Sequence, residues 1–211
     1  MTTHIFPKSF HKKMLARQTG RHFYAFKRAF DFCAALAAIV LSGWLMALIA
    51  LLIFAEDGAP ALFRQERMGR GEKLFTLYKF RSMRRDAPNV ASKELKNPQK
   101  YMLRIGKILR KTSLDELPQL FNILRGEMSF IGPRPLIPAE TEIRRLRRQY
   151  GVYTVRPGVT GWAQVNGRDK LPIKHKAMLD KFYIDHMGVY LDLRIIKRTV
   201  FYVFERRGIS H

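Results

Sequence analysis

The sequence predicts a mostly helical α+β protein in which one small domain follows a membrane-inserted helix near the N-terminus. The first observation is an unbroken run of 24 uncharged residues, Phe32 to Ala55. As a straight helix this run covers roughly 36 Å, enough to cross a bilayer. The second observation is the pattern behind it, where the two-residue alternation of a β-hairpin precedes several stretches with helical spacing. With 211 residues, 47% of them hydrophobic, the chain can form one modest core.

The composition of the chain is strongly basic. It contains 39 Lys and Arg against 17 Asp and Glu, which gives a formal net charge of +22. Such a surface repels itself unless it faces something anionic, so we expect nucleic acid, acidic lipid or phosphorylated substrates as partners. The single cysteine, Cys33, excludes an intramolecular disulfide and a cysteine-rich zinc site, which fits a reducing compartment.

The apolar run divides the chain into a basic N-terminal segment (1–28), a membrane-inserted helix (29–57) and a domain (58–211). A cleaved signal peptide is the alternative, but the run starts late and lacks a convincing cleavage site. Residues 1–28 carry four Lys and three Arg and no acid, and the residues after the run are also basic. The positive-inside rule draws both flanks to the cytoplasmic side. A helix that bends at Ser42-Gly43 and returns satisfies both, while an ordinary single span stays open.

The residues from Ala61 to Met83 are typical of a β-hairpin with its turn at MGRG. Alternation places Lys79 and Arg81 on one face of the second strand, together with Phe75 and Leu77. Two basic side chains on an edge strand protect a sheet against aggregation, and this is the simplest interpretation of the pair.

The residues after the hairpin predict a polar loop and then a short helix at 101–111 that ends near Arg110. Further on, the segment IGPRPLIP is expected to be extended and stiff. A turn at Pro157-Gly158 leads into a short strand that continues through Val165.

Apolar residues at helical spacing predict two further helices, at 139–150 and 172–187. The tail at 189–207 mixes apolar and basic residues, and it either docks on the core or lies in a bilayer interface. On the first helix, the arginines expected largely outside the apolar side are Arg144, Arg145, Arg147 and Arg148. On the second helix, the residues expected to face the core are Met178, Leu179, Phe182, Tyr183 and His186.

The stretch RKTSLDELPQLFNILRGEMSFIGPRP places two adjacent acids, Asp115 and Glu116, among basic residues. One interpretation is local. Ser113 and Glu116 match a capping box, or Asp115 itself caps a helix whose first turn tolerates Pro118. Either way the acids are expected at a helix N-terminus, where the dipole favours anions, including phosphate.

The second interpretation is chemical and rests on the basic neighbours of the acid pair. Arg110 precedes Asp115 by five residues, Arg134 is fixed between two prolines, and Lys79 and Arg81 share a strand face. Such cations lower the pKa of a carboxyl group and bind phosphate. An ionised Asp115 among them can hold a divalent cation or attack a phosphorus atom. The residues by themselves leave capping and catalysis both open.

Four long motifs occur in order along the chain: KRAFDF, RQERMGRGEKLFTLYKFRSM, RKTSLDELPQLFNILRGEMSFIGPRP and VRPGVTGWAQVNGRD. Together they resemble the bacterial sugar transferase family, the monotopic phosphoglycosyl transferases, from about Lys27 to about Arg198. The resemblance implies an enzyme that moves a sugar 1-phosphate from a nucleotide-diphosphate sugar, usually a UDP-sugar, to undecaprenyl phosphate and releases UMP. It also implies a place at the cytoplasmic face of the bacterial inner membrane, against anionic lipid.

By this resemblance Asp115 is the nucleophile, forms a covalent phosphosugar intermediate and contacts Mg²⁺, and Glu116 is its partner in an acid dyad. The resemblance gives Lys79, Arg110 and Arg134 as the basic residues around the substrate phosphates, and Arg81 is added because it shares a strand face with Lys79. The residues expected to shape the nucleotide pocket are Pro133 and Pro135.

The family's membrane segment is a re-entrant helix broken at a Ser-Pro pair, whereas here Ser42 is followed by Gly43. A glycine bend is softer than a proline bend. The two basic flanks together with the resemblance nevertheless favour re-entry, with amphipathic interfacial helices around the catalytic domain.

Two other classes of function agree with the charge: a membrane-tethered nucleic-acid-binding protein and a noncatalytic membrane scaffold. No helix-turn-helix, zinc-finger or RRM signature accompanies the basic residues, so we expect no nucleic acid. The histidines lack metal-binding spacing, so we expect no zinc. The residues of the last motif that either approach the substrate or shape a turn are Arg156, Arg168 and Asp169.

Overall fold

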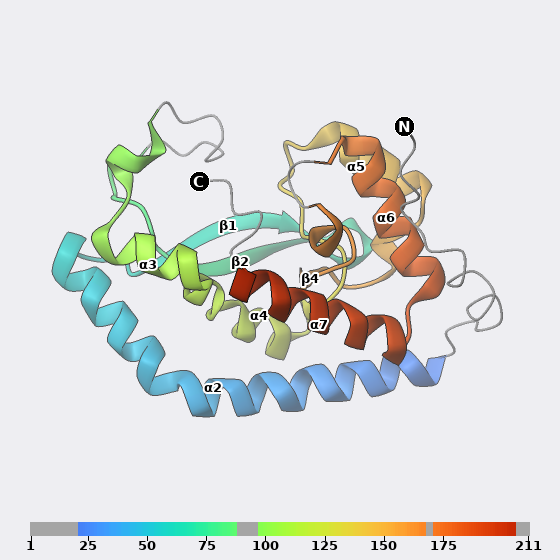
Figure 1. Cartoon of the computed structure of the whole chain (residues 1–211), viewed down its shortest axis with the longest axis horizontal. Helices are drawn as coiled ribbons and strands as arrows, with labels where there is room; N and C mark the ends of the chain where they lie inside the picture. Colours follow the sequence, from blue (N-terminus) through green and yellow to red (C-terminus); the bar gives the residue numbers. More distant parts are fainter. Residues whose placement is uncertain (1–20, 88–96, 168–170, 206–211) are drawn as a thin grey trace.

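A 37-residue helix, α2 (Arg21–Asp57), lies along one side of the molecule, and the other elements are stacked against it (Figure 1). The computed structural model describes residues 21–87, 97–167 and 171–205; residues 1–20 and part of the expected polar loop lie outside these ranges. The predicted fold class is confirmed in its coarse form, a mostly helical α+β protein with a long apolar N-terminal helix and a short β-hairpin. The division at residues 28 and 57 stays a prediction.

The apolar side chains of α2 point largely away from the protein. Its most apolar window, with a mean hydropathy of 2.6, is only 11% buried. Leu41 and Trp44 are 75% and 70% exposed. Because water does not favour such a surface, α2 has both the length and the exposed composition of a helix that inserts into a membrane.

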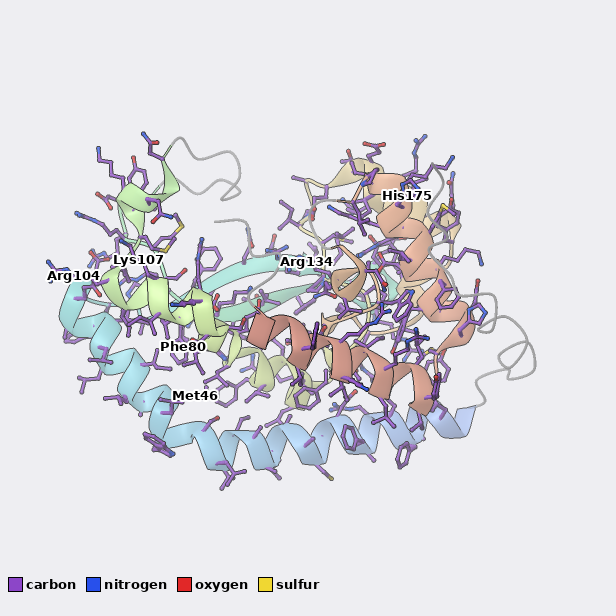
Figure 2. The ribbon with its side chains drawn as sticks, viewed as in Figure 1. Met46, Phe80, Arg104, Lys107, Arg134 and His175 are labelled. Atoms are coloured by element: carbon purple, nitrogen blue, oxygen red, sulfur yellow. The ribbon has the colours of Figure 1, made fainter. Side chains whose placement is uncertain are left out.

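The helix α2 is continuous but not straight. Figure 1 shows it change direction near its middle, and Figure 2 shows Met46 close to this bend. The Ser42 hydroxyl donates a hydrogen bond of 2.6 Å to the carbonyl oxygen of Ala38. This contact competes with the helix's own hydrogen bonds and so bends it. The Ser42-Gly43 pair therefore accompanies a bend, while the helix itself runs unbroken from Arg21 to Asp57.

The predicted hairpin is confirmed. Strands β1 (Leu62–Met68) and β2 (Leu74–Phe80) pair antiparallel around a short 3₁₀ turn, η1 (Arg70–Glu72). Phe75 and Leu77 lie on the face that packs against α2 and α4, in a cluster with Ala35 and Ile123. Lys79 follows on the same face by alternation, which carries its amine to the edge of this cluster.

Short helices and turns form the rest of the chain. In order they are η2 (Pro98–Tyr101), α3 (Arg104–Thr112), η3 (Leu114–Glu116), α4 (Gln119–Arg125), β3 (Ser129–Ile131), α5 (Thr141–Gln149), η4 (Val152–Thr154), β4 (Gly158–Thr160), η5 (Gln164–Asn166), α6 (Ile173–His186) and α7 (Val189–Glu205). The helices begin and end close to the expected residues. The expected strand is shorter than predicted: β4 pairs parallel with β3, ends at Thr160, and the chain then enters η5.

Helices α6 and α7 form a core with β3 and the turn before η5. Leu179 and Tyr183 of α6 meet Leu191 and Ile195 of α7. Met178, which was expected in this core, is exposed. The expectation was wrong because α6 also turns buried residues toward α5, so that its buried side is rotated away from position 178.

The start of α2 is tied to two other helices. Lys27 forms an ion pair of 2.8 Å with Asp192 of α7. The guanidinium of Arg28 donates to the last carbonyl oxygens of α4, those of Ile123 and Leu124, at 2.7 and 2.8 Å. A cation is favourable there because the carbonyl groups at a helix C-terminus carry partial negative charge.

The end of α2 is tied to α3 and to the hairpin. The Glu56 carboxylate accepts hydrogen bonds from the backbone amides of Arg104 and Ile105, at 2.6 and 3.1 Å. It thereby caps α3, and Figure 2 shows Arg104 where α3 meets this end of α2. Asp57 pairs with Arg81 at 3.0 Å. Both ends of α2 thus hold elements of one and the same domain.

Candidate active site

The acid pair lies on the short turn that joins α3 to α4. Ser113 ends α3 in the left-handed region, with a φ of 58°, and Asp115 and Glu116 then form η3. Neither Ser113 nor Pro118 makes a side-chain capping hydrogen bond, and Asp115 lies inside η3 rather than before a helix. Both capping interpretations are therefore wrong. The left-handed residue turns the chain sharply, and the acids face the hairpin instead of the start of α4.

Glu116 is fixed by a cation from the hairpin. Its Oε1 atom lies 2.7 Å from the Nζ atom of Lys79 on β2. The two side chains are 28% and 21% exposed, so the pair is partly shielded from water. This contact joins residues 37 positions apart and sets the acid turn against the edge of the sheet.

Asp115 is half-buried beside this pair. Burial raises the pKa of its carboxyl group from 3.8 to about 6; Lys79 and Arg110 oppose the rise and Glu116 adds to it. A carboxyl group with a pKa near 6 is mostly ionised at neutral pH but is poorly solvated, which is the state that a nucleophile or a metal ligand needs.

The close packing of α3 against Ser82, just after the end of β2, positions Arg110 near the acid pair. A Cβ atom at Gly106 would lie 2.1 Å from the carbonyl oxygen of Ser82, so only glycine permits this approach. The Arg110 Nε donates to the Ser82 hydroxyl at 2.9 Å. Burial lowers the pKa of Arg110, and the nearby charge of Asp115 opposes this shift.

Arg134 is exposed between two buried prolines, Pro133 and Pro135. Figure 2 shows it over the middle of the molecule, beside the hairpin. Pro133 and Arg134 line a small pocket with Met68, Tyr153 and Pro157, while Pro135 is not among its lining residues. The predicted nucleotide role of the two prolines stays a prediction.

Arg81 is not brought to the acid pair. Its guanidinium is buried, pairs with the Asp57 carboxylate at 3.0 Å and donates to the carbonyl oxygens of Asp57 and Gly58. It shares a strand face with Lys79, as expected, but its guanidinium is held by the end of α2. The geometry therefore gives Arg81 a structural role, and phosphate binding by it stays a prediction without geometric support.

Arg67 is a candidate that the sequence interpretation missed. Cross-strand pairing of Arg67 with Phe75 puts its side chain on the face that also carries Lys79. Its Nη1 donates to the carbonyl oxygen of Pro135 at 3.1 Å. Burial lowers the pKa of Arg67 to about 10 and Arg134 adds to this, while Glu140 and Glu116 oppose it. The register of the predicted hairpin, carried across to the first strand, contained this signal.

The acid pair fits a metal ion only as part of a shared coordination sphere. Within residues 21–87, 97–167 and 171–205, no group of three or more His, Cys, Asp or Glu side chains is placed to hold a metal. Mg²⁺ is commonly held by one or two carboxylates together with substrate phosphates and water. Asp115 and Glu116 supply such carboxylates. Arg168 and Asp169 lie outside the described residues.

Comparison with known proteins identifies the family of the chain. The model of a family described as bacterial sugar transferase matches residues 22–206. The chain is 38% identical to the uncharacterized sugar transferase EpsL of Bacillus subtilis, over 87% of this chain and 90% of the relative. It is 40% identical to the UDP-glucose:undecaprenyl-phosphate glucose-1-phosphate transferase of Caulobacter vibrioides, over 82% of this chain and 68% of the relative.

Other relatives are longer. The UDP-N-acetylgalactosamine-undecaprenyl-phosphate N-acetylgalactosaminephosphotransferase of Aeromonas hydrophila is 37% identical over 90% of this chain, which spans 46% of that relative. The region shared with each of these proteins includes the hairpin, the acid turn and the Pro-rich segment.

Proposed function

Because the chain belongs to the bacterial sugar transferase family, we propose that it moves a sugar 1-phosphate from a UDP-sugar to undecaprenyl phosphate and releases UMP. Relatives whose names state this class of reaction match most of the chain. The observation that carries the proposal is the acid turn: a half-buried Asp115 beside Glu116, with the Lys79 amine 2.7 Å from the Glu116 carboxylate. This arrangement concentrates negative and positive groups at one place, as phosphoryl transfer requires.

In the first proposed step, an Asp115 carboxylate oxygen attacks the phosphorus atom that bears the sugar. A bond forms from Asp115 to phosphorus, the bond from phosphorus to the bridging oxygen breaks, and UMP leaves with that oxygen. In the second step, a phosphate oxygen of undecaprenyl phosphate attacks the same phosphorus. The bond to Asp115 breaks, so the carboxylate is regenerated and the sugar diphosphate lipid is released. The two steps need no net proton transfer.

The charges around Asp115 support both steps. Lys79 and Arg110 favour the ionised carboxylate that attacks. Arg67 and the exposed Arg134 supply further positive charge at the adjoining edge of the hairpin, where a diphosphate can bind. Mg²⁺, held by Asp115 and Glu116 with the substrate phosphates, would neutralise charge on the transferring group.

We further propose that α2 is re-entrant and that the domain lies on the cytoplasmic face of the inner membrane. Near its start α2 contacts α7 through Lys27, and near its end it caps α3 through Glu56. Two helix ends that hold the same domain cannot lie on opposite sides of a bilayer unless that domain crosses it too. The bend near Ser42-Gly43 and the basic flanks support the same topology.

UMP release from UDP-sugars, measured in vesicles that contain undecaprenyl phosphate, tests the function. We expect release with at least one donor, loss of release after chelation of divalent ions, and loss in Asp115→Asn with the fold retained. A labelled sugar phosphate should become attached to Asp115 when the lipid acceptor is omitted. Turnover by Asp115→Asn at the wild-type rate would contradict the nucleophile, and no UMP from a full panel of UDP-sugars would contradict the function.

A further inference from the structure

The segment that carries Arg134 is anchored at four successive carbonyl oxygens, each by a different partner. The Pro133 oxygen accepts from the Gly158 amide at 2.9 Å, and the Leu136 oxygen accepts from the Met68 amide at 2.8 Å. Between them, the Arg134 oxygen accepts from Arg147 Nη1 at 2.6 Å and the Pro135 oxygen from Arg67 Nη1 at 3.1 Å. Two of the four residues are prolines without an amide donor, so these carbonyl contacts fix the backbone.

Arg147 differs from the other anchors because it is itself buried and ion-paired. It was expected on the outward side of α5, but the structure buries it against α6. Its Nε and Nη2 atoms lie 2.8 and 2.6 Å from the Asp180 Oδ2, and the two side chains are 4% and 1% exposed. The sequence expectation was wrong because the sequence of α5 alone does not reveal an acid on α6.

A buried ion pair of this kind is weak evidence for stability. Apolar residues of similar size often stabilise a core equally well, because two desolvated charges cost about as much as their attraction returns. Here the pair leaves one arm of Arg147 directed at the Arg134 carbonyl oxygen. What the charged pair adds over an apolar pair is therefore this one directed hydrogen bond to the segment that presents Arg134.

We propose that Arg147, held by Asp180, is a positioning residue that sets the direction of the Arg134 side chain toward the substrate phosphates. The proposal rests on the proposed function of Arg134. The Arg134 side chain is exposed, so its direction depends on the backbone that carries it. Positioning matters because small displacements of a phosphate-binding group in such a site cost up to about 100-fold in rate.

A mutant cycle tests this inference through UMP release. The double variant R147M/D180L replaces the pair with apolar residues and should fold, with kcat/KM lowered on the order of 10- to 100-fold. In the Arg134→Ala background the same double change should have no further effect, because it acts through Arg134. Independent, multiplicative losses would overturn the inference. Arg148→Met is the matched control: Arg148 is the next residue of α5, exposed and paired with Glu72, and its loss should leave kcat/KM unchanged.

A second variant and a second readout keep the test decisive. Arg147→Lys retains a charge for Asp180, but its single amine cannot replace the fork that serves two partners, so it should show the same loss in a stable protein. Hydrogen exchange at the Met68 and Gly158 amides should become faster in both variants and stay unchanged in α7. Unchanged exchange at both amides would overturn the inference even if the wild type released no UMP, an outcome that would separately contradict the proposed function.

Discussion

Replacing Asp115 by Asn should stabilise the protein at neutral pH while it abolishes turnover. The pKa of Asp115 rises from 3.8 to about 6 on folding because burial disfavours the charged form. A raised carboxyl pKa means that the folded state binds the proton more tightly. The stabilisation that this tighter proton binding gives to the folded state is fully present below pH 3.8 and is lost as the pH rises through 6. Above pH 6 the ionised Asp115 therefore destabilises the fold.

The size of this effect follows from the difference between the two pKa values. About two pKa units correspond to about 3 kcal/mol. The side chain is only half-buried and water screens part of the cost, so we expect Asp115→Asn to gain about 1 to 2 kcal/mol at pH 7.5. For a domain of this size that gain raises the unfolding temperature by about 3 to 6 °C.

Thermal unfolding in nanodiscs at pH 7.5 and pH 4.5 measures this. The gain should be present at pH 7.5 and should shrink at pH 4.5, where the wild-type carboxyl group is mostly protonated. The control is Asp185→Asn, because Asp185 is an exposed acid paired with Lys181 and its replacement should change little at either pH. An unfolding temperature for Asp115→Asn at or below the wild-type value at pH 7.5 would refute the claim that burial raises the pKa of Asp115.

Three further variants test other contacts of the site. Lys79→Met removes the cation that lowers the pKa of Asp115 most, so the acidic limb of the pH profile of kcat/KM should move to higher pH. An unchanged pH profile would contradict this. Arg81→Met leaves Asp57 without its buried partner and should cost about 3 kcal/mol of stability with KM for the donor unchanged, whereas a raised KM in a stable protein would restore its phosphate role. Glu56→Ala removes the cap of α3 and should lower the free energy of unfolding by about 1 kcal/mol in urea titrations, and no change there would mean that water caps α3 equally well.

The sequence predicts the parts of this fold whose signals are local. The uncharged run identifies α2, and alternation with a glycine-rich turn identifies the hairpin and puts Lys79 on the same face as Phe75. These features can be predicted from the spacing of apolar residues along the sequence and from its turn residues alone. The acid pair could also be found this way, because its unusual basic setting is visible in one stretch.

What the sequence does not predict depends on contacts between distant segments. Arg147 has the spacing of an outward residue until Asp180 of α6 is placed beside it. Strand alternation places Arg81 on the same face as Lys79 and so suggests a phosphate ligand, but the structure pairs its guanidinium with the Asp57 carboxylate. The capping prediction for the turn at Asp115 fails for another reason. SLDE matches a capping box, but Ser113 adopts a left-handed conformation and makes no side-chain capping hydrogen bond. In each case a partner or a backbone conformation outside the local pattern decides the role of the side chain.

The site is assembled from segments that α2 holds at two separate places. The start of α2 fixes α4 and α7 through Arg28 and Lys27. The end of α2 fixes α3 and the hairpin through Glu56 and Asp57. The acid turn lies between α3 and α4, so one flank of Asp115 depends on each end of the helix. A change in the bend of α2 would therefore move the two flanks relative to each other. The proposed insertion of α2 in a bilayer would therefore be mechanically coupled to the geometry around Asp115.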